Sequence, residues 1–236
     1  MRRAITLLMA AGLLTTVGLR AADEPGKPRL ADQAALKAYG GLVGSWRGAG
    51  QPQRGRSQGA WTESASWAWK LSADSASLEM AVEKGKYLKA AALKPGDGPG
   101  SYVLDATLAD GSKRTFRGKA EAGKPLALAA EGAGEGVRRV TLTIPNDLRF
   151  LLLLESQTPA GSFARLGEVG FTRNGVSFAA GEAGPVCVVT EGRGTIQVSH
   201  QGKTYWVCCS GCRDLFNENP AAMIAEAEAR QKKGDK

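Results

Sequence analysis

Four cysteines, gathered in one short segment near the C-terminus, are the residues best suited to chemistry. Cys187 is followed after twenty residues by Cys208 and Cys209, and Cys212 follows Cys208 after three residues. A hairpin that ends in a thiol and leads into a helix carrying another can bring several sulfur ligands within about 4 Å of one another. A metal bound there supplies folding energy that a small domain lacks. The spacing therefore predicts a metal site built from thiolates.

The residues around these cysteines predict the elements that position them. Residues 195–198 and 204–207 alternate like two short strands, and residues 200–203 (His-Gln-Gly-Lys) between them are typical of a hairpin turn. A short helix is expected at the last cysteine. Asn-Pro at 219–220 is then typical of the N-cap and first position of a second helix over residues 221–230.

The same segment resembles a known family of metal-binding domains. The string Gly-Lys-Thr-Tyr-Trp-Val-Cys-Cys-Ser-Gly-Cys at 202–212, followed by Phe216 and by Asn-Pro at 219–220, resembles the YHS/TRASH family. The resemblance extends over residues 185–231 and implies a small α+β domain made of a hairpin and helices. Its members are implicated in sensing or handling heavy metals, often copper or zinc.

Carried onto this sequence, the resemblance implies that Cys187, Cys208 and Cys212 are the metal-binding thiols of the family. Soft thiolates favour Cu(I) or Zn(II) as the metal. Either Cys209 or His200 could complete a tetrahedral set, and Cys209 is the stronger candidate. Because consecutive strand residues point to opposite faces, a metal held by both Cys208 and Cys209 requires a bend between them.

The sequence departs from the family pattern in the loop after Cys187. Val188 stands where proline is usual, and Glu191 stands where glycine is usual. We therefore expect the conformation of this loop to differ from that of the family.

Disulfide bonds are the alternative to a metal, because an exported protein meets an oxidising compartment. Four cysteines allow three pairings, one of which needs a strained bond between the adjacent Cys208 and Cys209. The other two join Cys187 to one of that pair and leave a short-range bridge to Cys212. These pairings make a poor framework, so metal binding is favoured, with redox interchange allowed. Cys209 and Cys212 also have the spacing of a redox pair, but no thioredoxin-like βαβ pattern surrounds them.

The histidine count argues against an enzyme. His200 is the only histidine among 236 residues, which excludes a zinc centre with three histidines and the HExxH motif. Because no histidine precedes it, the first domain has none that could act as the base of a catalytic triad or hold a haem. No glycine-rich phosphate loop precedes a helix. A non-enzymatic protein is expected.

Residues 42–178 carry the repeated alternation of a mainly β domain. Eight to ten short antiparallel strands are expected, with turns at Asp-Gly 110–111 and Pro-Asn-Asp 145–147, and this pattern favours a barrel or sandwich. A short helix over 32–39 precedes them. The expected fold class is thus a mainly β protein with an antiparallel barrel over 31–178, followed by the small cysteine-rich α+β domain.

The motif Gly44-x-Trp46 after the short helix resembles the first strand of lipocalin-like (calycin) barrels. The resemblance implies that Trp46 closes one end of the barrel and that an arginine near the last strand lies over its ring. Arg173 is the best candidate for that arginine, and Arg165 is the second. Such an arrangement gains a cation–π contact.

One alternating face within the barrel region could line a ligand cavity. Trp61, Trp67 and Trp69 share this face with Glu63, which could serve as a polar group in a site for a small apolar molecule. A small-molecule carrier, with the cysteine domain structural or redox-active, is therefore the alternative function. Aromatic residues at strand spacing more often belong to the core, and that interpretation is favoured.

The N-terminus has the three-part pattern of a secretory signal peptide over residues 1–21. Arg2 and Arg3 precede the uncharged stretch 4–19, whose 16 residues are fewer than the roughly 20 that span a bilayer. We expect export to the periplasm or the extracellular space, and no membrane span in the mature chain.

The rest of the predicted organisation is a linker over 22–30, a second linker over 179–184 and a charged tail over 232–236. Cleavage of the signal would remove three arginines and no acid, lowering the formal charge from +8 to +5. The remaining basic residues are scattered rather than concentrated on one element, so no nucleic-acid partner is expected.

Overall fold

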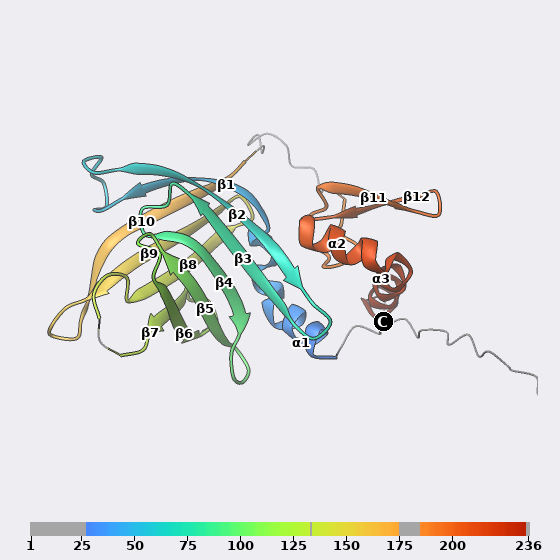
Figure 1. Ribbon diagram of the computed structural model, residues 1–236, viewed down its shortest axis with the longest axis horizontal. Helices are drawn as coiled ribbons and strands as arrows, with labels where there is room; N and C mark the ends of the chain where they lie inside the picture. The colour runs from blue at the N-terminus through green and yellow to red at the C-terminus, as the bar shows by residue number, and fades with distance from the viewer. Residues whose placement is uncertain (1–26, 133, 175–184, 235–236) are drawn as a thin grey trace, which may run out of the picture.

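Ten antiparallel strands form a closed barrel in the computed structural model, which describes residues 27–132, 134–174 and 185–234 (Figure 1). Each strand pairs with its neighbours in sequence, and the last strand returns to pair with the first. The predicted mainly β antiparallel barrel is confirmed. The strands are β1 (Gly44–Gln51), β2 (Trp61–Leu71), β3 (Ala76–Glu83), β4 (Leu88–Pro95), β5 (Ser101–Leu108), β6 (Lys113–Lys119), β7 (Leu126–Ala130), β8 (Arg139–Asn146), β9 (Arg149–Gln157) and β10 (Phe163–Arg173).

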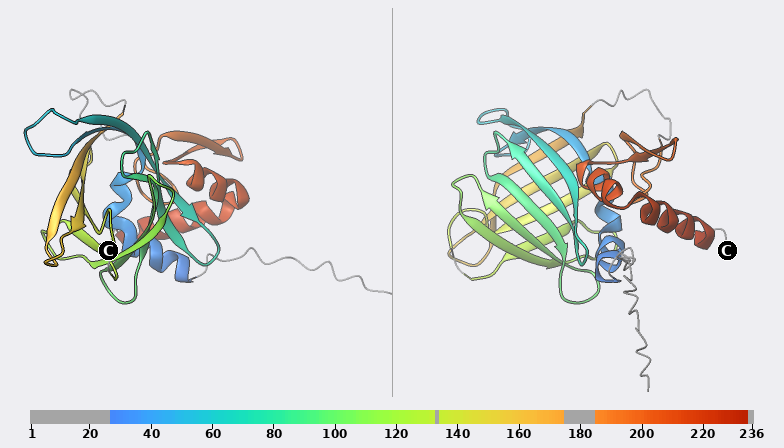
Figure 2. Two further views of the ribbon diagram at one scale, coloured as in Figure 1. Left: turned by 60° about the vertical axis from the view of Figure 1, so that its left-hand side comes forward. Right: turned by 45° about the vertical axis from the view of Figure 1, so that its right-hand side comes forward.

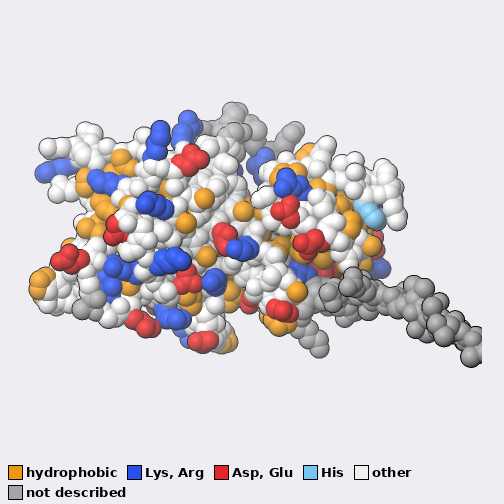
Figure 3. Space-filling view, viewed as in Figure 1, with side chains coloured by type: hydrophobic (Ala, Val, Ile, Leu, Met, Phe, Trp, Pro, Cys, Tyr) orange, Lys and Arg blue, Asp and Glu red, His pale blue; other side chains and the backbone are white. Residues whose placement is uncertain are grey.

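The barrel interior is filled by the alternating apolar face of these strands. An aromatic group lies near its helix-covered end: the ring centroids of Trp46 and Phe150 are 4.8 Å apart, and those of Phe150 and Phe171 are 4.4 Å apart in a stacked pair. All three side chains are at most 1% exposed. Charged side chains of both signs are intermixed on the outer face drawn in Figure 3.

Helix α1 (Lys27–Leu36) and the 3₁₀ helix η1 (Lys37–Leu42) lie at one end of the barrel, beside the C-terminal helices (Figures 1 and 2). The helix begins earlier than residue 32, and residues 27–30 of the predicted linker are helical. Proline is tolerated in a first helical turn, so Pro28 does not prevent this. The Arg29 side chain is only 2% exposed and donates hydrogen bonds to Gln33 and to Glu226. A tertiary contact therefore fixes this turn.

The C-terminal segment forms a two-stranded hairpin and two helices, in the predicted order. These are β11 (Ile196–His200), β12 (Lys203–Val207), α2 (Ser210–Glu218) and α3 (Pro220–Gly234). Gln201 and Gly202 both have positive φ, as a two-residue type I′ turn requires. Asn219 caps α3, since its side-chain oxygen accepts a hydrogen bond from the N–H of Ala222 at 3.1 Å.

Helix α3 continues to Gly234, so the charged tail predicted over 232–236 is helical through that residue. Glutamine and lysine are good helix formers, which explains the extension. The predicted signal peptide over 1–21, the linker over 179–184 and the last barrel residues 175–178 lie outside the described residues. Within the described ranges, no helix is both long enough and apolar enough to cross a membrane.

Arg173 closes the helix-covered end of the barrel. Its guanidinium carbon lies 4.2 Å from the centroid of the Trp46 ring, and it donates hydrogen bonds to the carbonyl oxygens of Val43, Asp147 and Gly41. Gly44 has a φ of 131°, and a Cβ on it would fall against this guanidinium. The glycine of the Gly-x-Trp motif thus leaves space for the Arg173 guanidinium, and the tryptophan supplies the ring that the guanidinium covers.

Replacing Arg173 with lysine should lower the free energy of unfolding by about 2 kcal/mol, because an ammonium group cannot cover the ring and bond three carbonyls together. Urea unfolding followed by far-ultraviolet circular dichroism measures this change. Arg149→Lys, at an exposed arginine on β9, is the control and should leave stability nearly unchanged. Equal losses in the two variants would contradict the role given to Arg173.

Candidate metal centre

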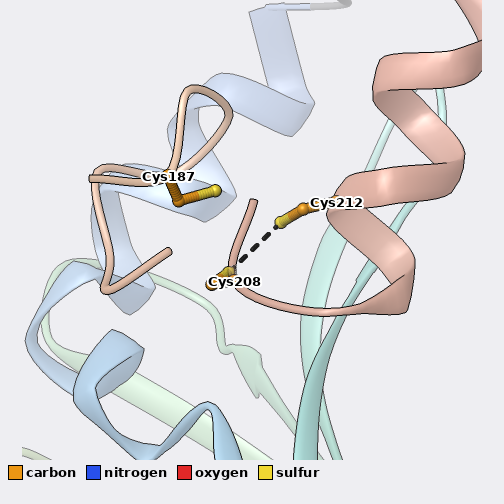
Figure 4. A group of neighbouring side chains, drawn as sticks. All are labelled: Cys187, Cys208 and Cys212. Atoms are coloured by element: carbon orange, nitrogen blue, oxygen red, sulfur yellow. Dashed lines mark hydrogen bonds between the residues drawn. The ribbon is translucent and has the colours of Figure 1, made fainter. Parts of the chain in front are cut away.

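Three buried sulfur atoms from three separate segments meet in the C-terminal module, defined here as residues 185–234. Cys187 lies in the loop before β11, Cys208 directly follows β12, and Cys212 lies in the first turn of α2 (Figure 4). Their Sγ atoms all lie within 4.8 Å of one another, and those of Cys208 and Cys212 are 3.5 Å apart. The three residues are 1%, 5% and 0% exposed. This geometry is close enough to hold a metal ion.

Backbone hydrogen bonds fold the Cys187 loop toward the other two thiols. The Cys187 N–H donates to the carbonyl of Gly192 at 2.7 Å, and the Glu191 N–H donates back to the Cys187 carbonyl at 2.9 Å. The Val188 N–H donates to the carbonyl of Trp206, which ties the loop to β12. Glu191 has a φ of 60°, a left-handed conformation that glycine adopts more readily. Although glutamate stands at position 191, the backbone there keeps the left-handed conformation that is typical of glycine.

Thr190 is a residue of this site that the sequence reasoning did not single out. Its Oγ1 lies 3.4 Å from the Sγ of Cys187, 3.4 Å from that of Cys208 and 3.9 Å from that of Cys212. The signal that could have found it is its place three residues after Cys187, in a loop that must turn back on itself. Its hydroxyl can donate a hydrogen bond to a thiolate or accept one from a thiol.

The thiols divide into acceptors and donors of hydrogen bonds. The pKa of Cys187 is lowered chiefly by a hydrogen bond from Cys208, and the pKa of Cys209 is lowered by the same neighbour. The pKa values of Cys208 and Cys212 are raised, above all by their hydrogen bonds to Cys187. A cation among the sulfurs would replace the shared protons, because metal binding requires thiolates.

The two candidates for a fourth ligand, Cys209 and His200, lie outside the group of three. Cys209 has an extended backbone, with φ −158° and ψ 174°, and its Sγ lies 3.9 Å from the Sγ of Cys208. Its Sγ accepts a hydrogen bond at 3.3 Å from the N–H of Trp69 in the barrel. His200 lies at the tip of the hairpin, where it pairs with Lys203. All four cysteines are free thiols and are buried.

The four cavity candidates of the barrel are spread along β2. Trp67 and Trp69 are 3% and 4% exposed and belong to the core. Trp61 is half-buried at the other end of the strand, and its Nε1 donates a hydrogen bond to Glu63 at 2.7 Å. At about 3.3 Å per residue, Trp61 and Trp69 lie roughly 26 Å apart along the strand. The four side chains therefore do not form one compact group.

Comparisons with known proteins do not identify a family for this chain, so its function is argued from its residues and their geometry. No protein-family model matches the chain, and no curated protein matches it. Among solved structures, the chain is similar to the crystal structure of Rv2717c from M. tuberculosis, with 16% identity and a TM-score of 0.40. That match covers 59% of this chain and 97% of the other. A likeness at this level supports no conclusion about function.

The buried carboxyl of Glu63 should make the barrel sensitive to pH. Burial raises the pKa of Glu63, although hydrogen bonds from Trp61 and from the Lys86 N–H act in the opposite direction. Because the pKa is higher in the folded state, stability is greatest when the group is protonated. It falls as pH rises from the unfolded pKa through the folded one.

Glu63→Gln keeps an oxygen that accepts the two hydrogen bonds and removes this titration. Urea unfolding as a function of pH should show the variant gaining stability relative to the natural protein as pH rises past the ordinary glutamate pKa. The exposed carboxylate Glu83 on β3 is the matched control, and Glu83→Gln should show no comparable trend. A difference that stays constant with pH would contradict the buried-acid assignment.

Proposed function

We propose that the protein binds a soft metal ion, Cu(I) or Zn(II), through the thiolates of Cys187, Cys208 and Cys212. The observation that carries this proposal is the convergence of three buried sulfurs within 4.8 Å from a loop, a strand end and a helix. Thiolate ligands select soft metals such as Cu(I) and also bind Zn(II). A zinc form would use a fourth donor to reach tetrahedral coordination. Candidates for that donor are Cys209, the Thr190 hydroxyl and a water molecule.

The biological role that we propose is metal binding, sensing or delivery outside the cytoplasm, without catalysis. The N-terminal pattern of a secretory signal over residues 1–21 supports export. The resemblance of residues 185–231 to YHS/TRASH domains supports metal handling. Export also favours a thiolate site that is shielded from oxidants, and the burial of all three sulfurs is consistent with that need.

A thiol-redox function is the second candidate, because one pair of sulfurs is close. The Sγ atoms of Cys208 and Cys212 are 3.5 Å apart, so a small movement would bring them to bonding distance. Oxidation of that pair by a disulfide donor would remove two of the three proposed ligands. The metal content and the free-thiol content of the same sample therefore separate the two functions.

The deciding experiment measures both quantities on the full chain purified without oxygen. We expect about one bound or titratable Cu(I) or Zn(II) ion per chain and no disulfide. Elemental analysis gives the metal, and thiol titration under denaturing conditions gives the cysteines. Four free thiols with no metal bound after titration would contradict the proposal. A Cys208–Cys212 disulfide in the native protein would favour the redox function.

Cys208→Ala should abolish metal binding and loosen residues 187–230, while the barrel remains folded. The physical reason is that metal binding stabilises the small module, whereas the barrel is closed by hydrogen bonds among its own ten strands. Hydrogen exchange resolved along the chain measures both effects. Ser199→Ala, on the exposed face of β11, is the control and should leave metal binding and exchange unchanged. Metal binding retained in Cys208→Ala would contradict the ligand assignment.

A further inference from the structure

Strand β2 extends beyond its neighbour β1 at the helix-covered end of the barrel. Gly44, the first residue of β1, pairs with Trp67, so Trp69 has no partner residue on β1. On its other side Trp69 pairs with Leu78 of β3. A buried N–H without a partner is costly. The Trp69 N–H instead donates to the Sγ of Cys209 in the module, at 3.3 Å.

The same end of β2 receives the first turn of helix α2. A Cβ on Gly211 would overlap the carbonyl oxygen of Trp69, so only glycine allows this close approach. Cys209 directly follows the proposed ligand Cys208, and Gly211 directly precedes the proposed ligand Cys212. The segment that carries Cys208 and Cys212 therefore packs directly against the barrel.

Ion pairs connect the module to the helices at this end of the barrel, around the contact with Trp69. Arg29 of α1, 2% exposed, forms an ion pair with Glu226 of α3 at 3.2 Å. Lys37 of η1 pairs at 2.9 Å with Glu191, which lies in the loop that follows Cys187. Within the module, Arg230 of α3 contacts the same Glu191 carboxylate at 3.3 Å and ties the Cys187 loop to this helix. Each segment that carries a thiol is thus held next to the barrel or its N-terminal helix.

We infer that the barrel is a positioning part of the metal centre, and that Cys209 and Gly211 hold the module against strand β2. This inference rests on the proposed metal-binding function. Docking on β2 fixes the spacing between Cys208 and Cys212, so docking and metal binding stabilise each other. Linkage makes the effect reciprocal: docking raises metal affinity, and metal raises the protection of the Trp69 amide.

The test uses Gly211→Ala in the full chain, with Zn(II) as the metal and Co(II) as a spectroscopic probe of thiolate geometry. Alanine is the better helix former, so a module independent of the barrel would be unaffected or stabilised by the change. We expect Zn(II) affinity to fall about tenfold or more and the Co(II)–thiolate absorption bands to shift. Protection of the Trp69 amide, measured by hydrogen exchange, should be lost.

Ser210→Ala is the matched control, because Ser210 lies in the same turn but is exposed. It should leave affinity, spectrum and exchange unchanged. Arg29→Met is a second, independent test, at a residue of α1 outside the segments that carry the thiols, and should also weaken Zn(II) binding. Unfolding of the barrel followed by circular dichroism verifies that each variant is folded.

The outcomes separate this inference from the proposed function. If the natural chain binds no metal, the proposed function is wrong and the inference falls with it. If the natural chain binds Zn(II) and Gly211→Ala and Arg29→Met bind it equally well, the function stands and the inference is overturned. Unchanged exchange of the Trp69 amide between the metal-free and metal-bound protein would also overturn it.

Discussion

Three sulfur atoms within 4.8 Å of one another cannot all carry negative charge in a buried site unless a cation lies among them. Without a cation the thiols must share protons, and the lowered pKa of Cys187 beside the raised pKa values of Cys208 and Cys212 reflects that sharing. This constraint makes the C-terminal module depend on what occupies the space between the sulfurs. The three segments that carry the sulfurs therefore need support that holds them at this spacing.

The barrel supplies that support through its helix-covered end. Arg173 and Trp46 close the barrel there, and Gly44 gives the arginine its space. Next to this closure, β2 projects beyond β1 and presents the N–H and carbonyl of Trp69 to the module. The two parts of the chain thus meet where the Trp69 N–H donates to the Sγ of Cys209 and Gly211 lies close to the Trp69 carbonyl.

Much of the fold was predictable because its signals are local. Alternating strands, the turn at Asp-Gly 110–111 and the Gln-Gly turn of the hairpin depend on residues adjacent in sequence. The cysteine spacing predicted a thiolate metal site, and the resemblance to YHS/TRASH domains implied which three thiols form it. Arg173 was identified over Arg165 only through the resemblance to lipocalin-like barrels.

Other features depend on contacts between distant residues and were not predictable. The helical state of residues 27–30 follows from the contact of Arg29 with Glu226, almost two hundred positions later. Cys209 was predicted as a fourth ligand because its type and spacing fit, and this stays a prediction. Its contact with the Trp69 N–H depends on where β1 ends beside β2, which the sequence does not show. Thr190 was missed for a related reason: a hydroxyl is a weak signal unless the loop around it is known.

The central claim is that Cys187, Cys208 and Cys212 together hold one metal ion. X-ray absorption spectroscopy of the metal-loaded full chain tests it most directly, since it counts the sulfur atoms bound to the metal. The account predicts three sulfur neighbours, at about 2.3 Å if the metal is Zn(II). A first shell made only of nitrogen and oxygen atoms, or one with fewer than three sulfurs, would contradict it.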